Sequence, residues 1–193
     1  MGERGEARGR VWRGVGLALA LTALGACAGP AGRSDLQAQA EPRPVPDLRF
    51  VDAAGRQRSL AEFRGRAVLL NVWAPWCEPC RNELDSLDGL EARLGGPDFE
   101  VVAVSMDMNG PGGVARFYEK HGIRRLGVYA DPNYAASRVL GARGIPTTLL
   151  IDKEGREVGR ALGAQTWDGP RMLEAIERLL GRQPIAAPGA SAG

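Results

Sequence analysis

Residues 67–84 read AVLLNVWAPWCEPCRNEL, and this stretch decides the fold. Its first seven residues form a nearly continuous apolar run, which is typical of a β-strand buried on both faces. A helix is expected from Cys77, because leucines recur at helical spacing as far as the Gly-Gly-Pro stop at residues 95–97. Cys77 and Cys80 therefore lie where a buried strand passes into a helix.

The spacing of Cys77 and Cys80 predicts redox chemistry. Residues three apart share one face of a helix, so the two sulfurs can bond. Cys77, in the first turn, faces unpaired backbone N–H groups and the positive end of the helix dipole, and both lower the pKa of its thiol. We expect the Cys77 thiolate to attack a substrate disulfide and the more buried Cys80 to resolve the mixed disulfide.

Two other interpretations of the pair compete with redox activity. A zinc half-site would need two further ligands, and the sequence offers only Cys27 and His121 as soft ligands. A purely structural disulfide would close a short loop, which constrains the unfolded chain little. We therefore expect neither a metal nor a cofactor.

The rest of the chain alternates strands with helices. A hairpin is expected over residues 47–60, with Ser59 capping a short helical turn after it. Further strands are expected at residues 99–105, 128–130, 147–152 and 157–162, helices at 114–121, 134–140 and 168–180, and a loop at 110–113. This order predicts an α/β fold with right-handed crossovers, closed by an antiparallel hairpin.

Charge and length limit the possible classes of protein. The 193 residues carry 25 basic and 23 acidic side chains, so composition gives no reason to expect a nucleic-acid partner. Residues 47–181 are long enough for one domain with its own core. Residues 27–46 and 182–193 are rich in Pro, Ala, Gly and polar side chains, which predicts a flexible tether and a disordered tail.

The N-terminus is typical of an export signal. Four arginines within residues 4–13 precede an uncharged apolar run at 15–26. As a helix this run would span only about 18 Å, against the ~30 Å of a bilayer core. Residues 24–27 (LGAC) resemble a bacterial lipoprotein box, which would make residues 1–26 a signal peptide and Cys27 the lipidated residue. Ordinary cleavage after Ala28 and an uncleaved short anchor remain as alternatives, and each places the domain outside the cytoplasm.

Residues 68–84, 99–107 (FEVVAVSMD) and 141–163 (GARGIPTTLLIDKEGREVGRALG) together resemble the TlpA/ResA-like proteins of the thioredoxin fold. The resemblance implies a central mixed sheet flanked by helices, with an N-terminal hairpin extension and a mid-chain insertion. It also implies a membrane-tethered thiol-disulfide oxidoreductase on the periplasmic side of a bacterial membrane, more a reductant than an oxidant. Expected partners are cysteine-containing clients, such as apocytochrome c or a copper chaperone, and a membrane thiol donor.

The resemblance assigns a client-binding loop beside the redox pair. Pro146 matches the family's cis-proline, which would leave the backbone of Ile145 free to pair with an extended client peptide. A trans proline at a strand start is the alternative. Trp76, beside the nucleophile, is expected to shape the client surface, whereas Trp73 is expected in the core.

The resemblance also assigns an acid. Asn71 stands where ordinary thioredoxins have a buried carboxylate, and an amide cannot exchange a proton. Glu83, one turn after Cys80, matches an acidic residue that tunes the cysteines and relays protons, and burial should raise its pKa. A solvated glutamate in a surface pair is the alternative interpretation.

Two other functions share this fold. A thiol peroxidase would need, in that family, a threonine three residues before its cysteine, where this chain has Ala74. A binding or scaffold module would use the surface near Pro146 without exchanging disulfides. The fold alone does not choose among these functions, because function depends on the site.

Overall fold

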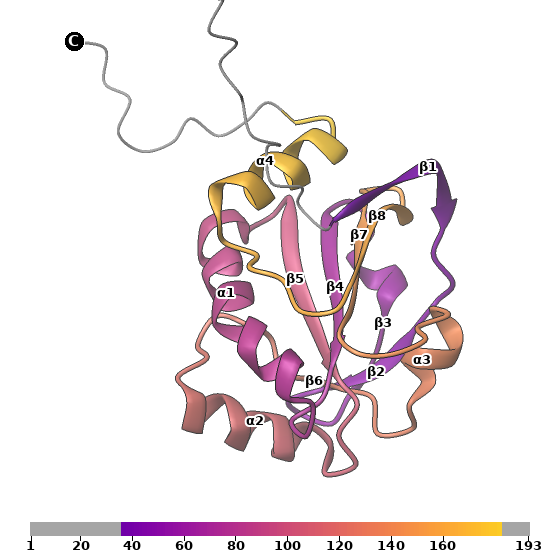
Figure 1. The fold of residues 1–193 in the computed structure, drawn as a ribbon. Helices are drawn as coiled ribbons and strands as arrows, with labels where there is room; N and C mark the ends of the chain where they lie inside the picture. Colours follow the sequence, from indigo (N-terminus) through magenta and orange to yellow (C-terminus); the bar gives the residue numbers. More distant parts are fainter. Residues whose placement is uncertain (1–35, 183–193) are drawn as a thin grey trace, which may run out of the picture. The chain divides into compact units, whose positions relative to one another are not determined.

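A computed structural model describes residues 36–182 of the chain (Figure 1). Within that range, eight strands form one mixed sheet in the order β1-β8-β7-β4-β5-β6-β2-β3. The elements in chain order are β1 (Gln37–Pro44), β2 (Arg49–Asp52), β3 (Gln57–Ser59), the 3-10 helix η1 (Leu60–Phe63), β4 (Ala67–Trp73), α1 (Glu78–Leu94), β5 (Phe99–Ser105), α2 (Gly110–His121), β6 (Tyr129–Ala130), α3 (Ala135–Val139), β7 (Thr147–Ile151), β8 (Arg156–Leu162) and α4 (Pro170–Leu179).

The centre of the sheet is β4, which is buried along its whole length as its apolar run predicts. It pairs parallel with β5 and antiparallel with β7. This mixed sheet with flanking helices confirms the predicted thioredoxin-like fold. The β2–β3 hairpin confirms the expected N-terminal extension.

The two faces of the sheet are covered by different helices. Leu69 and Trp73 of β4 belong to the apolar cluster that includes α1, α2 and α4, whereas Val68 and Leu70 belong to the cluster that includes η1 and α3. Side chains alternate between faces along a strand, so Asn71 lies on the α1 face. This alternation directs a buried polar group toward the helix that carries the cysteines.

Helix α1 begins and ends where the sequence predicts. Cys77 is its N-cap residue, Pro79 lies in the first turn, where a missing N–H costs nothing, and Gly95 follows the last turn. Its apolar stripe packs Leu84, Leu87 and Leu90 onto the sheet. The helix therefore holds the Cys77–Cys80 pair rigidly at the end of β4.

The loop expected at residues 110–113 is wrong, because these residues form the first turn of α2. Pro111 is tolerated in a first helical turn. A Cβ atom at Gly113 would lie 2.5 Å from Asp107 Oδ2 and 2.7 Å from Asn109 Cβ, so only glycine allows this close approach. The glycines that suggested a loop instead let the helix begin against the end of β5.

The flexible tether expected at residues 27–46 is wrong for residues 37–44, which form β1. This edge strand pairs antiparallel with β8 through the backbone, and nearly all its side chains are exposed. Backbone pairing at a sheet edge needs no apolar side chains, so the composition shows no strand pattern. The remaining predictions for residues 1–26, Cys27, the rest of the tether up to residue 35, and residues 183–193 fall outside the described residues.

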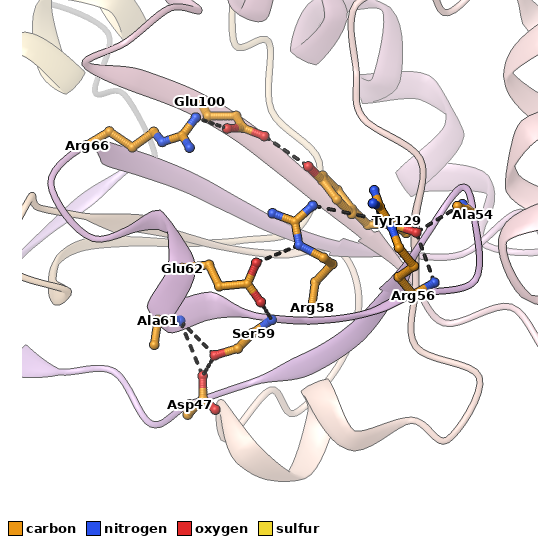
Figure 2. A network of polar contacts seen from close by, with 11 residues as sticks. Asp47, Ala54, Arg56, Arg58, Ser59, Ala61, Glu62, Arg66, Glu100 and Tyr129 are labelled. Carbon is orange, nitrogen blue, oxygen red and sulfur yellow. Dashed lines mark hydrogen bonds and ion pairs between the residues drawn. The ribbon is translucent and has the colours of Figure 1, made fainter.

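Polar contacts join the N-terminal hairpin to η1, the 3-10 helix that follows it, as Figure 2 shows. Ser59 and Glu62 form a reciprocal capping box at η1, which confirms the predicted cap. The Arg58 guanidinium donates to Glu62 Oε2 at 2.6 Å. Arg58 and Arg66 lie over the Phe63 ring at 5.7 and 5.4 Å from its centroid. These contacts stabilise the sheet edge remote from β1.

Among residues 36–182, no helix is long and apolar enough to cross a bilayer.

Candidate active site

The two cysteines form a disulfide at the junction of β4 and α1. Their Cα atoms are 5.3 Å apart. The Cys80 amide donates to Cys77 Sγ at 3.2 Å. Cys77 is 7% exposed and Cys80 fully buried, so an approaching thiol or disulfide reaches Cys77 first. A thiolate at Cys77 would keep the amide donor and face the positive end of the helix dipole.

The loop directly before β7 lies against the disulfide. The Ile145–Pro146 peptide bond is cis, as the resemblance implies. The Ile145 carbonyl oxygen lies 3.8 Å from Cys77 Sγ. Ile145 is half-buried and Pro146 buried, and the Pro146 carbonyl accepts from the Gly163 amide at 2.9 Å. The structure thus brings together Cys77, Cys80, Ile145 and Pro146, which are far apart in the sequence.

Glu83 lies on the buried face of α1, so the surface-pair interpretation is wrong. Its side chain is 1% exposed. Oε1 accepts from Asn71 Nδ2 at 2.8 Å, and Oε2 accepts from the Gln165 amide and from Trp167 Nε1, each at 3.0 Å. Loss of solvent raises the pKa of Glu83, and these three hydrogen bonds oppose that rise without cancelling it.

Sequence reasoning missed the residues that hold Glu83. Trp167 and Gln165 precede α4, and their donors reach Glu83 across more than eighty residues of chain. Thr148 faces Asn71 in the register of β4 and β7, and its Oγ1 accepts from Asn71 Nδ2 at 2.8 Å. Only the strand register and the path of the chain after β8 reveal these contacts.

Three large apolar side chains are exposed at the end of the sheet that carries the disulfide. Trp76 is 63%, Met108 78% and Leu162 64% exposed. Trp76 follows β4, Met108 follows β5, and Leu162 is the last residue of β8. These three strands run in one direction, because β5 is parallel to β4 and both β4 and β8 are antiparallel to β7. We call these three residues the apolar rim. Of them, only Trp76 was predicted as part of a client surface.

The other candidates are placed in the structure as follows. Trp73 is fully buried and stacks on Tyr118 with ring centroids 5.8 Å apart, which confirms its core position. His121 ends α2 and stacks on Phe117 at 4.2 Å. Ala74 is buried and carries no hydroxyl for a peroxide. Between residues 36 and 182, no cluster of three His, Cys, Asp or Glu side chains could bind a metal ion.

The sequence model of the Redoxin family matches residues 40–179, nearly all of the described chain. The chain belongs to the Redoxin family. A curated relative, the thiol-disulfide oxidoreductase ResA of Geobacillus thermodenitrificans, is 32% identical over 171 residues, which cover 86% of this Redoxin-family chain and 95% of the relative.

Solved structures agree with this assignment. A Chlorobium tepidum protein assigned as thiol:disulfide interchange protein DsbE has a TM-score of 0.64 and 28% identity, covering 73% of this Redoxin-family chain and 98% of that one. The exposed lipoprotein thioredoxin of Streptococcus pneumoniae has a TM-score of 0.57 and 26% identity, covering 68% and 98%. This Redoxin-family member is a thioredoxin-fold thiol-disulfide oxidoreductase.

Proposed function

We propose that the protein reduces disulfides of client proteins outside the cytoplasm, with Cys77 as the nucleophile and Cys80 as the resolving thiol. The observation that carries this proposal is the difference between the two sulfurs. Cys77 is the partly exposed one, it caps α1, and it accepts a hydrogen bond from the Cys80 amide. Each of these features favours a thiolate at Cys77 rather than at Cys80.

The reaction moves two electrons from the protein to the client. The Cys77 thiolate attacks one client sulfur, and the other leaves as a thiolate. Cys80 then loses its proton and attacks Cys77 Sγ. The second client thiolate is released, and the Cys77–Cys80 disulfide seen in the structure is formed.

Glu83 is the acceptor we assign to the Cys80 proton. It lies three residues after Cys80 on α1, and both side chains are buried. A carboxylate with a raised pKa takes a thiol proton more readily than an ordinary surface carboxylate does. Glu83 therefore assists the second step rather than the first.

Client binding is assigned to the cis-proline loop and the apolar rim. The Ile145 carbonyl lies against Cys77 Sγ, where it could pair with the backbone of an extended client segment. Pro146 shapes this loop, and Trp76 offers an exposed indole beside the disulfide. Contacts that are mainly backbone and apolar suit unfolded clients better than one fixed folded surface.

The direction of electron flow and the location rest on likeness to relatives. An exposed lipoprotein among the solved structures supports lipid attachment at Cys27, with residues 1–26 as signal peptide. A lipid-anchored periplasmic protein of this kind would be recharged by a membrane thiol donor. Clients with paired cysteines, such as apocytochrome c or a copper chaperone, are the substrate class we propose.

Trapping tests this function. In the full chain, Cys80→Ser should stall as a mixed disulfide between Cys77 and its client, which non-reducing electrophoresis and mass spectrometry would identify. Cys77→Ser is the matched control, since it keeps one buried thiol and should trap nothing. Equal trapping by both variants, or none by Cys80→Ser in cells that contain oxidised clients, would overturn the proposal.

A further inference from the structure

The amide of Asn71 is satisfied on one side only. Its nitrogen donates to Glu83 Oε1 and to Thr148 Oγ1, each at 2.8 Å. Its oxygen, Oδ1, is buried without a hydrogen-bond partner. A buried carbonyl oxygen without a donor is unfavourable, so this orientation has to be favoured by what the nitrogen contacts.

Protonation of Glu83 requires the Asn71 amide to accept a hydrogen bond from the carboxyl group instead of donating one to it. Oε2 already accepts from the Gln165 amide and Trp167 Nε1, which are fixed donors. The proton must therefore reside on Oε1, the oxygen that faces Asn71. Two donors, the Glu83 O–H and the Asn71 N–H, would then point at each other, and one of them has to turn away.

We propose that Asn71 and Thr148 form a hydrogen-bond switch that follows the protonation of Glu83. When the carboxylate gains a proton, the Asn71 amide rotates by about 180° about its terminal torsion and places Oδ1 where Nδ2 was. Oδ1 then accepts from the Glu83 O–H and from the Thr148 hydroxyl, which reverses from acceptor to donor. Loss of the proton restores the original orientation.

The switch makes the two protonation states alike in hydrogen bonding. In each state, one end of the amide has two partners and the other has none. The cost of the unpartnered end is therefore nearly the same with and without the proton. Asn71 thus acts as a positioning residue, which lets Glu83 accept and release a proton without losing a partner.

Within residues 36–182, no charged side chain forms a hydrogen bond with Glu83. Strand β4 presents the amide of Asn71, and β7 presents the hydroxyl of Thr148. The segment before α4 presents Trp167 and Gln165, both neutral donors. Cys80 and Cys77 precede Glu83 by three and six residues, and in the disulfide neither cysteine titrates. Asp168, which precedes α4, lies against Gly89, six residues beyond Glu83 on α1.

The inference rests on the proposed role of Glu83, but its test needs no turnover. In the oxidised full-length protein, NMR can follow the two side-chain amide protons of Asn71 and the carboxyl carbon of Glu83 during one pH titration. If the amide rotates, both amide protons lose their acceptors and shift upfield, with the midpoint of the carboxyl carbon. If it stays fixed, only the proton facing Oε1 responds, and the switch is refuted while client reduction can still stand.

A variant pair tests the same point in a folded protein without relying on the titration range. In Glu83→Gln, the introduced oxygen must face Trp167 and Gln165, so its NH₂ faces Asn71 and should hold the amide in the rotated orientation at every pH. Glu91→Gln is the matched control, because Glu91 is also on α1, also has a raised pKa, and accepts instead from the Val101 amide. Rotated-type shifts in Glu83→Gln alone support the switch. Shifts in Glu83→Gln like those of the high-pH wild type overturn it.

Discussion

Replacing Trp167 by phenylalanine should remove one hydrogen bond from the buried carboxylate of Glu83. Trp167 is fully buried, and its Nε1 donates to Glu83 Oε2 at 3.0 Å. A hydrogen bond to a charged group contributes about 1.5–3 kcal/mol, and one between neutral groups about 0.5–1.5 kcal/mol. The loss should therefore be roughly 1 kcal/mol larger when Glu83 is ionised than when it is protonated.

The control for this variant is Trp73→Phe. Trp73 is equally buried on the same face of the sheet, but its ring stacks on Tyr118, and none of the hydrogen bonds to Glu83 in the described chain comes from it. Both variants lose the same ring atoms, so their packing costs largely cancel. Urea unfolding at a series of pH values then isolates the hydrogen bond to Glu83 as the pH-dependent part of the difference between the two free energies of unfolding, because the buried N–H of Trp73 does not contact Glu83.

The sign of the pH dependence decides the result. Trp167→Phe removes a donor that favours the carboxylate, so the pKa of Glu83 should rise further. The deficit of Trp167→Phe relative to Trp73→Phe should be roughly 1 kcal/mol larger above that pKa than below it. A difference that is constant with pH would show that Trp167 stabilises the fold by packing alone, and a larger difference in acid would show that its N–H does not favour the carboxylate.

Three further predictions follow from other contacts. Because burial raises the pKa of Glu83, the wild-type protein loses free energy of unfolding as pH rises through that pKa. Glu83→Gln has no such loss, so in urea unfolding it should become more stable relative to wild type with rising pH. Trp76→Ala and Leu162→Ala should raise KM for an unfolded disulfide-bonded client more than for a small disulfide, and equal effects would remove the apolar rim from client binding. Ser59→Ala should cost about 1 kcal/mol of unfolding free energy without changing client reduction, and a loss of activity at full folding would contradict this.

The sequence predicts those parts of the fold in which local pattern and tertiary environment agree. Strands β4 and β5 are buried on both faces, so their apolar runs mark their bounds without help from partners. Helix α1 carries its own start and stop signals, and Cys77 is placed by them. The disulfide pair, the greater exposure of Cys77 and the burial of Glu83 could all be foreseen from this one segment and its family likeness.

Other features depend on partners far along the chain. Strand β1 is held by backbone hydrogen bonds to β8. Its side chains are mostly polar and exposed, so its sequence shows no strand pattern. Residues 110–113 begin a helix because Gly113 fits against Asp107, and the glycine-rich sequence alone does not reveal this contact. Trp167 reaches Glu83 because α4 packs on α1's side of the sheet. Propensity is local, and these contacts are not.

The proposed transfer of the Cys80 proton to Glu83 needs no acid in β4, where Asn71 is neutral. A carboxylate on the strand would be rigidly held, whereas Glu83 is carried by the same helix as Cys80 and keeps its spacing to that thiol. Its two oxygens have different partners: fixed donors hold Oε2, and the reversible pair of Asn71 and Thr148 adjoins Oε1. The proton is thereby directed to one oxygen. An acid at position 71 would replace the amide donor to Oε1 by a second negative charge, and the two carboxyl groups could not both ionise at that distance.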